Sequence, residues 1–296
     1  MVDARDTLAT TVGGFCSVYL GLPFGVVKTR LQTQGTVKSY NGMIHCFKRI
    51  AAEEGMASLW KGAVPAFSSS VLACATTSSV SSIAKSAGLA LHARKQLGYY
   101  DDPMLDEAIV GTATSVFLAT AIAPAELIQT KLQFQRGRLG TGEYRGPWDC
   151  LQKVLRHEGA RGLYRGYSGL LLLYVPANLL FIGSHKAYMS AFAKWQHTEP
   201  TKESYPLYTL ASLGLAAVTA WNVLYPADVL KAQMQTASDG VLSLRGAAKR
   251  VYAQHGIRGF YRGWSVGAMY SLSWTGTFVI GVMTTQHFFG TPEDNK

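Results

Sequence analysis

The sequence predicts an all-α membrane protein, with six transmembrane helices in three pseudo-symmetric repeats and short amphipathic helices between the spans of each pair. Three observations carry this prediction. Two short motifs each occur three times, in the same order, along the 296 residues. The prolines that open the first motif, Pro23, Pro124 and Pro226, lie 101 and 102 residues apart. Six apolar stretches alternate with the motifs, and such self-similarity indicates modules that stack into one domain.

The repeats are placed at about residues 1–100, 101–203 and 204–296, and together they form a single transmembrane domain. Each repeat has one apolar stretch that contains the proline motif and one that follows the second motif. Every stretch is long enough to cross an apolar layer of about 30 Å at about 1.5 Å per residue. The six predicted spans are residues 7–34, 64–92, 105–134, 169–195, 206–235 and 265–288.

Between the two spans of each repeat lies a charged, amphipathic stretch that is too short to cross a membrane and suits its interface. These stretches are His45 to Glu54, Asp149 to Glu158 and Arg245 to His255. We expect them to form short helices on one side of the membrane. Six spans place both ends of the chain on one side as well.

Composition limits the classes of protein that fit. With 48% apolar and 16% charged residues, the chain is too apolar to be disordered. Its net charge of +10 fits nucleic-acid binding, an anionic membrane surface or the attraction of anionic solutes. The four cysteines form no metal-binding or disulfide pattern, so we expect free thiols and no bound metal. The first ten residues, with Asp3 and Asp6, show no cleavable signal, and we expect internal targeting.

The first motif places three polar positions on one face of a helix. Counted from the proline, these positions are two, five and nine, whose mutual offsets of zero, three and seven match helical periodicity. Position two is Gly25, Glu126 or Asp228. Position five is Lys28, Gln129 or Lys231, and position nine is Gln32, Gln133 or Gln235. The second motif runs from Glu54 to Gly62, from Glu158 to Gly166 and from His255 to Gly263.

These two motifs, three times each at this spacing, resemble those of the mitochondrial carrier family, and the resemblance covers nearly the whole chain. It implies a three-fold pseudo-symmetric bundle around a central cavity, which opens alternately to the matrix and to the intermembrane space. It also implies a monomer in the mitochondrial inner membrane that moves a small-molecule substrate. Cardiolipin is the bound lipid that the resemblance implies, and no other cofactor is expected.

In that family, the acid of one repeat pairs with the base of the next and closes a gate on the matrix side. The resemblance therefore implies the ion pairs Glu126–Lys231 and Asp228–Lys28, with a neutral junction where Gly25 faces Gln129. Both missing charges fall on the same junction, so no buried charge is left without a partner. The family also has glutamines that brace the pairs from beneath. The expected matrix gate comprises Lys28, Gln32, Glu126, Gln129, Gln133, Asp228, Lys231 and Gln235.

At the opposite end of the cavity the chain departs from the family pattern, which has an acid and a base on each even helix. The corresponding positions hold Ser81, Ser82 and Lys85, then His185 and Lys186, then Val282, Met283 and Gln286. No acid is present at any of the three, so a charged gate facing the intermembrane space is not expected.

Two further sets of residues come from the resemblance. Glycines at helix starts, beside a cation, suit the phosphates of a lipid headgroup because free backbone amides bind anions. The expected cardiolipin-binding residues are Gly42, Lys61, Gly62, Gly146, Arg165, Gly166, Arg262 and Gly263. Substrate contacts are expected about two turns past the last glycine of the second motif, at Ser69, Leu173, Tyr174, Asn178 and Tyr270. None of these five is charged, which disfavours a strongly anionic substrate bound centrally.

Three functions remain open: a transporter by alternating access, a carrier-derived scaffold that no longer transports, and a proton or ion leak. The triplicated motifs favour the transporter, the uncharged contact positions favour the scaffold, and the incomplete gate favours the leak. An enzyme is not expected, since no nucleophile–base–acid set, phosphate loop or metal spacing occurs. Nucleic-acid binding is not expected either, because the basic residues are accounted for at membrane interfaces.

Overall fold

The computed structural model describes residues 4–35, 39–86, 103–138, 140, 142–196, 205–237, 243–271 and 273. Within these residues the regular structure is helical and contains no strand, which confirms the predicted all-α class. The five long helices are α1 (Ala4–Thr33), α3 (Ala63–Ser86), α5 (Pro103–Phe134), α7 (Tyr167–Gln196) and α8 (Tyr205–Thr236). The shorter elements are α2 (Met43–Glu53), α6 (Pro147–Gly162) and α9 (Leu244–His255), with 3-10 turns η1 (Met56–Trp60) and η2 (Ile257–Tyr261).

Five segments among the described residues are long and apolar enough to cross a membrane. They are Val12–Thr33, Met56–Ala84, Ala108–Phe134, Tyr167–Trp195 and Ala211–Thr236, in agreement with the first five predicted spans. The sixth predicted span begins as a helix at residues 264–271, and most of it lies outside the described residues.

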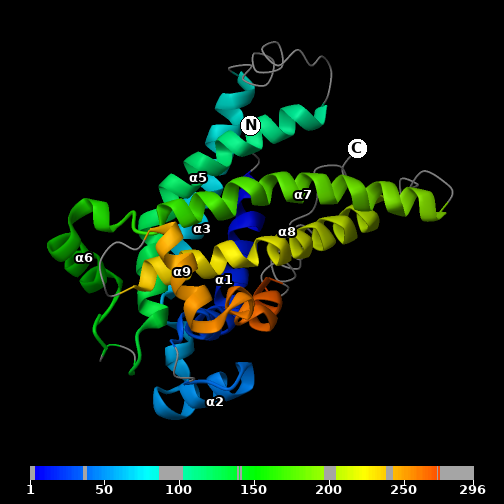
Figure 1. Ribbon diagram of the computed structural model, residues 1–296. Coiled ribbons are helices and arrows are strands. Elements are labelled where there is room, and N and C mark those ends of the chain that lie inside the picture. The colour runs from blue at the N-terminus through cyan, green and yellow to red at the C-terminus, as the bar shows by residue number, and fades with distance from the viewer. Residues whose placement is uncertain are drawn as a thin grey trace.

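Helices that follow one another in the chain pack side by side. In Figure 1, α7 and α8 run alongside each other over much of their length, and α3 and α7 both contact α5. The helices α1, α5 and α8 also contact one another, although more than sixty residues separate each from the next. These three helices carry the proline motifs, so the motifs of all three repeats meet.

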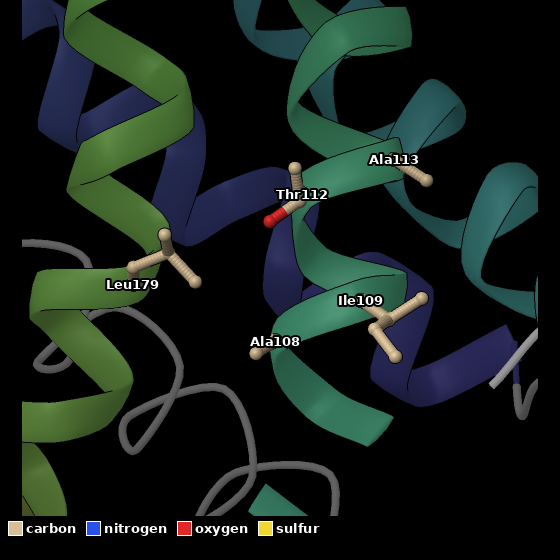
Figure 2. A pocket seen from close by; sticks show the side chains of 5 residues that line it. All are labelled: Ala108, Ile109, Thr112, Ala113 and Leu179. Carbon is tan, nitrogen blue, oxygen red and sulfur yellow. The ribbon is translucent and has the colours of Figure 1, made fainter. Parts of the chain in front are cut away.

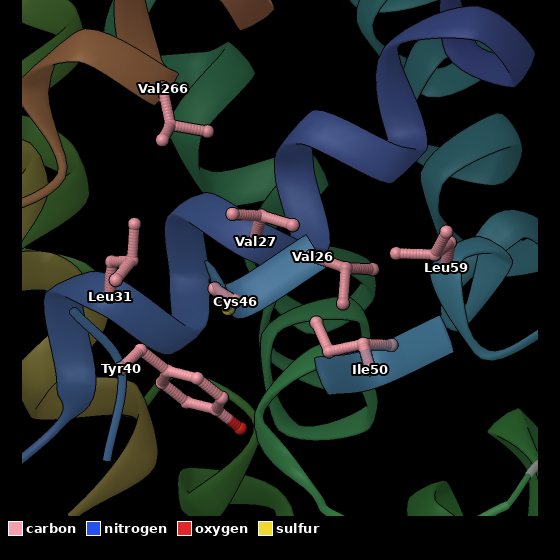
Figure 3. Close-up of a cluster of buried hydrophobic side chains, with 8 residues drawn as sticks. All are labelled: Val26, Val27, Leu31, Tyr40, Cys46, Ile50, Leu59 and Val266. Carbon is pink, nitrogen blue, oxygen red and sulfur yellow. The ribbon is translucent and has the colours of Figure 1, made fainter. Parts of the chain in front are cut away.

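Each short helix packs against the C-terminal part of the proline-containing helix before it. In the first repeat, Cys46 and Ile50 of α2 are buried against Val26, Val27 and Leu31 of α1, together with Tyr40, Leu59 and Val266 (Figure 3). The second cluster has Cys150 and Val154 of α6 in the equivalent places, and the third has Ala247 and Val251 of α9. Burial of these apolar faces, worth about 25 cal/mol per Å², holds the short helices in place.

The turns after the short helices depend on glycine. Gly55, Gly159 and Gly256 have φ angles of 88°, 68° and 62°, a backbone conformation that other residues adopt only at a cost. The first follows α2, the second breaks α6 internally, and the third ends α9. This turn directs the chain from each short helix into the next span, which explains the glycine at the second position of the second motif in all three repeats.

Candidate matrix gate and solute site

Two ion pairs join the proline-containing helices of different repeats. Lys28 Nζ of α1 lies 2.7 Å from Asp228 Oδ2 of α8, and Lys231 Nζ of α8 lies 3.2 Å from Glu126 Oε1 of α5. All four side chains are largely buried. The structure therefore brings together both pairs that the family resemblance implies. Because a buried charge is costly without its partner, these pairs favour the arrangement in which the three helices meet.

The glutamine of the first repeat supports one of these pairs directly. Gln32 Nε2 donates to Asp228 Oδ2 at 2.7 Å and to the hydroxyl of Tyr225 at 3.0 Å. Asp228 thus accepts hydrogen bonds from the side chains of α1 in two different turns, at Lys28 and Gln32. This contact gives Gln32 the geometry of a brace.

The other two glutamines are bound by threonines of the preceding repeat. The Thr29 hydroxyl donates to Gln133 Oε1, and the Thr130 hydroxyl donates to Gln235 Oε1, each at 2.8 Å. The side-chain amide nitrogens of Gln133 and Gln235 are buried and have no hydrogen-bond partner among the described residues. Both amides therefore keep a donor available on the inner side of the helix bundle.

We describe the expected matrix gate, called the matrix gate below, as three corners: Asp228 with Lys28, Glu126 with Lys231, and Gly25 with Gln129. The third corner differs from the other two, because Gln129 lies against Gly62, where an added Cβ would be 3.2 Å from Gln129 Cγ. A Cβ on Gly25 would meet Tyr270 Cε2 at 3.4 Å and Gln133 Nε2 at 3.5 Å. The neighbour of Gly25 is therefore the ring of Tyr270.

Four of the five predicted substrate-contact residues lie in three environments. Tyr174 donates a hydrogen bond from its hydroxyl to Glu126 Oε1 at 3.1 Å, and Tyr270 lies beside Gly25, so both tyrosines adjoin the matrix gate. Leu173 is only 2% exposed and packs in the protein interior. The Ser69 hydroxyl donates to the carbonyl of Pro65 in its own helix. Their contact with a substrate stays a prediction.

The fifth predicted contact residue, Asn178, lies where α7 crosses α5. A Cβ on Gly111 would be 2.0 Å from Asn178 Nδ2, so glycine is what allows the two helices to approach this closely. The amide nitrogen of Asn178 is buried with no hydrogen-bond partner in the described part of the chain. Asn178 thus occupies a helix–helix contact, and its role toward a substrate is a prediction.

An apolar pocket of about 400 Å³ lies close to this crossing (Figure 2). Four residues of α5 and one of α7 line it: Ala108, Ile109, Thr112, Ala113 and Leu179. None of the predicted substrate-contact residues lines this pocket, and its wall contains no charged side chain.

The basic residue of the second motif forms a contact that the sequence did not reveal. Lys61, which is 1% exposed, donates from Nζ to Glu54 Oε2 at 2.7 Å and to the carbonyl oxygen of Gln135 at 3.3 Å, and also contacts the carbonyl of Gly137. Gln135 and Gly137 follow the end of α5, in the next repeat. Lys61 therefore binds carbonyls just beyond the end of α5, and it shares the carbonyl of Gln135 with Arg30.

The other two repeats show the same contact. Arg165 donates to the carbonyl of Met234 at 3.1 Å, near the end of α8, and Arg262 donates to the carbonyl of Gln34 at 3.0 Å, just beyond α1. We call Lys61, Arg165 and Arg262 the inter-repeat clamps, since each joins its own repeat to the following one in cyclic order. Arg262 also contacts His255, which stands where the first two repeats have glutamates.

These contacts bear on the predicted lipid-binding residues. The side chains of Lys61 and Arg165 are buried, so a lipid headgroup would have to be held by other groups of the predicted set. Gly42 and Gly146 precede the first turns of α2 and α6, where backbone amides lack helical partners. Gly62, Gly166 and Gly263 open the following helices with positive φ. Cardiolipin binding stays a prediction.

Glu54 is a residue whose role sequence reasoning missed. Its carboxylate binds Arg30 through both oxygens and Lys61 through one, so it joins α1 to the clamp. Burial alone would raise the pKa of Glu54, but hydrogen bonds from Arg30 and Lys61 outweigh it and hold that pKa below its usual value. Glu158 makes the equivalent contacts with Lys131 and Arg165 in the second repeat. A signal was available, because these residues recur at the same places in the motifs.

Trp221 was also missed. Lys28 Nζ lies 4.5 Å from the centre of the Trp221 ring and 5.5 Å from that of Tyr270. A cation over an aromatic face is stabilised by the charge distribution of the ring. Trp221 belongs to α8 and lies outside both motifs, so the repeat pattern carried no signal for it.

At the opposite end of the helices, where the family pattern has a second gate, only part of the predicted arrangement is described. His185 Nδ1 lies 2.9 Å from the Ser212 hydroxyl, which links α7 to α8. The side chains of Ser81 and Lys85, and residues 282, 283 and 286, lie outside the described residues.

Together, the fold and the gate define a class: a multi-span helical membrane protein in which three repeats meet through charged and amide side chains. The family model described as "Mitochondrial carrier protein" matches residues 4–88, 100–195 and 202–293. The chain belongs to the mitochondrial carrier family, and it is a multi-pass transport protein of the mitochondrial inner membrane. The expectations that it is a carrier and not an enzyme are confirmed by this membership.

The similar proteins are named for different solutes. The mitochondrial basic amino acids transporter of Mus musculus is 32% identical over 266 residues, which is 88% of this chain and 81% of the relative. The glutamate/glycine mitochondrial carrier of Schizosaccharomyces pombe is 31% identical, with 88% and 86% covered. The mitochondrial carnitine/acylcarnitine carrier protein of Mus musculus is 28% identical, again with 88% and 86% covered.

Proposed function

We propose that the protein moves a small metabolite across the mitochondrial inner membrane by alternating access through a central cavity. The observation that supports this most directly is the pair of buried inter-repeat ion pairs, Lys28–Asp228 and Lys231–Glu126. They join helices that have no covalent connection at this level, so they can break and re-form as the helices separate. A set of reversible buried contacts at one end of a bundle is what a gate requires.

The predicted substrate-contact residues indicate the kind of solute. Tyr174 and Tyr270 offer aromatic faces and hydroxyls, and Ser69 a further hydroxyl, so the contact positions bring no net charge. The charges of the two ion pairs balance each other. A solute with both an acidic and a basic group, or an uncharged polar solute, therefore fits better than a strongly anionic one. The relatives named for amino acids and for carnitine point to the same range.

The test begins with thermal unfolding of the purified chain in cardiolipin-containing detergent, against a panel of mitochondrial metabolites. Basic amino acids, glutamate, glycine and carnitine come first in the panel. We expect one class of solute to raise Tm, since a ligand that binds only the folded state stabilises it. Uptake of that solute into proteoliposomes should then be saturable, and it should be lost in Asp228→Asn.

Two other outcomes would favour the alternative functions. If cardiolipin raises Tm but no solute does, and no uptake is measured, the protein acts as a membrane scaffold. Proton influx without solute, at a rate above that of protein-free vesicles, would support a leak instead.

We further propose that cardiolipin binds as a lipid ligand at the helix starts opened by Gly42, Gly62, Gly146, Gly166 and Gly263, and that the carrier works as a monomer. Free backbone amides at these starts support the lipid proposal, because they can donate to phosphate oxygens. Titration with cardiolipin should raise Tm more than titration with phosphatidylglycerol does. Light scattering should give the mass of one chain, 32.1 kDa, after correction for detergent.

A further inference from the structure

We propose that the ring of Tyr270 closes the third corner of the matrix gate, in the place of the ion pair that Gly25 and Gln129 cannot form. This inference rests on the proposed function, because it assigns Tyr270 a part in the gate of the transporter. It makes Tyr270 a positioning residue of the gate, in addition to any contact that it makes with a solute.

The first argument concerns the space beside Gly25. At the other two corners, position two carries a carboxylate, which binds the lysine of the next repeat. At Gly25 that carboxylate is missing, and the edge of the Tyr270 ring lies 3.4 Å from the point where a Cβ would be. Ordinary van der Waals contact covers this range, so the ring fills the space that a gate side chain would use.

The second argument concerns the brace. Gln32 Nε2 donates to the carboxylate of Asp228 at the first corner. Gln133 is the brace of the third corner, and its Nε2 points toward the same missing Cβ of Gly25, at 3.5 Å. Gln133 is 4% exposed, and this nitrogen has no hydrogen-bond partner among the described residues. The amide of Gln133 therefore faces the place where the other two corners carry a carboxylate, and at Gly25 it meets no acceptor among the described residues.

The third argument links the ring to the rest of the gate. Lys28 Nζ lies 5.5 Å from the centre of the Tyr270 ring while it binds Asp228 at 2.7 Å. Tyr270 therefore lies beside Gly25 of the third corner and also beside the ammonium group of Lys28 at the first corner. Movement of the ring would alter both corners together. An uncharged ring also excludes water without the cost of burying a further charge.

The experiment compares the loss of the ring in two backgrounds of the full-length carrier. The first background is the natural chain, and the second is Gly25→Asp with Gln129→Lys, which supplies the missing ion pair. Tyr270→Ala is made in both, and Tm is measured in cardiolipin-containing detergent. Tyr270→Phe tests whether the ring alone is sufficient. Met269→Ala is the matched control, because Met269 is the neighbouring large side chain and points to an exposed surface.

We expect Tyr270→Ala to lower Tm by about 4 °C or more in the natural background, and by less than half of that where the ion pair is present. Tyr270→Phe and Met269→Ala should each change Tm by less than about 2 °C. In proteoliposomes with a trapped pH-sensitive dye, Tyr270→Ala should raise proton influx several-fold, and the added ion pair should reverse most of this increase.

Equal losses of Tm in the two backgrounds would show that the ring only packs, and would overturn the proposal. So would a Tyr270→Ala carrier with unchanged Tm and proton influx. Should the charged pair prevent folding, Gly25→Asn is the second background, since it offers Gln133 an acceptor without adding charge. Neither readout requires a transported solute. The proposed function can therefore fail in the uptake assay while the coupling between the ring and the corner still decides this inference.

Discussion

The ammonium group of Lys28 has three neighbours at once: the carboxylate of Asp228 at 2.7 Å, the ring of Trp221 at 4.5 Å and the ring of Tyr270 at 5.5 Å. Cation–ring contacts add about 2 kcal/mol when both groups are removed from water. Lys28 is therefore held by more than its ion pair. Separation of α1 from α8 at this corner would require the lysine to leave two aromatic rings as well as a carboxylate.

Exchange of the two charges at this corner tests the pairing. Lys28→Asp and Asp228→Lys should each lower stability by about 3–5 kcal/mol, because each leaves two like charges facing one another in a buried site. The double exchange should recover part of this loss. Recovery should be incomplete, since the cation no longer lies over Trp221. Thermal unfolding of the four proteins gives the coupling free energy, and a double variant no more stable than the weaker single variant would contradict the pairing.

Two equivalent cysteines give a second prediction at the scale of residues. Cys46 in α2 and Cys150 in α6 are fully buried, and burial raises the pKa of each thiol to about 12. The reactive form is the thiolate, so at pH 7 its fraction falls about a thousandfold relative to an ordinary thiol. Maleimide should label both cysteines only after unfolding, and raising the pH to 8 should not make them reactive in the folded protein. Labelling of either in the folded protein at the rate of a free thiol would contradict the packing of α2 and α6.

At the scale of elements, the crossing of α5 and α7 depends on Gly111. Because an added Cβ would lie 2.0 Å from Asn178 Nδ2, Gly111→Ala forces the asparagine side chain to move. We expect a loss of about 1–3 kcal/mol in stability, typical of overpacking. Asn178→Ala in the same chain should restore most of the lost stability, because it removes the side-chain amide that the new Cβ would meet.

The matched control for this prediction is Gly14→Ala in α1. A Cβ there meets no atom within 4 Å, so the substitution should be neutral or slightly stabilising through helix propensity. If Gly111→Ala is as well tolerated as Gly14→Ala, the close approach of α5 and α7 is not required for stability.

The helices themselves were largely predictable from the sequence, because apolar length and the triplicated motifs are local properties. The first five predicted spans agree with the observed helices to within a few residues, except that the second is predicted to end at residue 92, beyond the described end of α3 at Ser86. The partner of each charged residue in the gate could also be expected, because the resemblance to the carrier family implies that the acid of one repeat pairs with the base of the next. Both implied ion pairs are present in the structure.

Other features of the site depend on side chains that break the symmetry. Nothing in the motifs indicated that Tyr270 lies beside Gly25, that Trp221 lies under Lys28 or that Asn178 faces Gly111. Each of these contacts arises from the relative rotation of two helices, which is set by packing over their whole length. The clamp of Lys61 was hidden for another reason, because its acceptors are backbone carbonyls, and these have no signature in the sequence.

At the scale of the whole molecule, the three repeats are interlocked. Every clamp and every ion pair of the gate joins one repeat to another, so a repeat that unfolds removes contacts from both neighbours. We therefore predict a single unfolding transition for the whole chain. The six tryptophans occur in all three repeats, at positions 60, 148, 195, 221, 264 and 274, and their fluorescence can follow the transition. Separate transitions for different repeats would contradict this prediction.

The cyclic order of the clamps has a consequence for how the carrier is made. Arg262 binds the carbonyl of Gln34 near the end of α1, although 227 other residues separate them in the chain. Because a chain is synthesised from its N-terminus, the end of α1 is made long before Arg262, and it lacks this contact until the last repeat is in place. Until then, the third repeat is not joined to the first by this clamp, and the end of α1 lacks its contact with Arg262. We therefore expect a chain truncated before Arg262 to remain incompletely assembled and to be degraded by quality-control proteases. It should not act as a smaller working carrier.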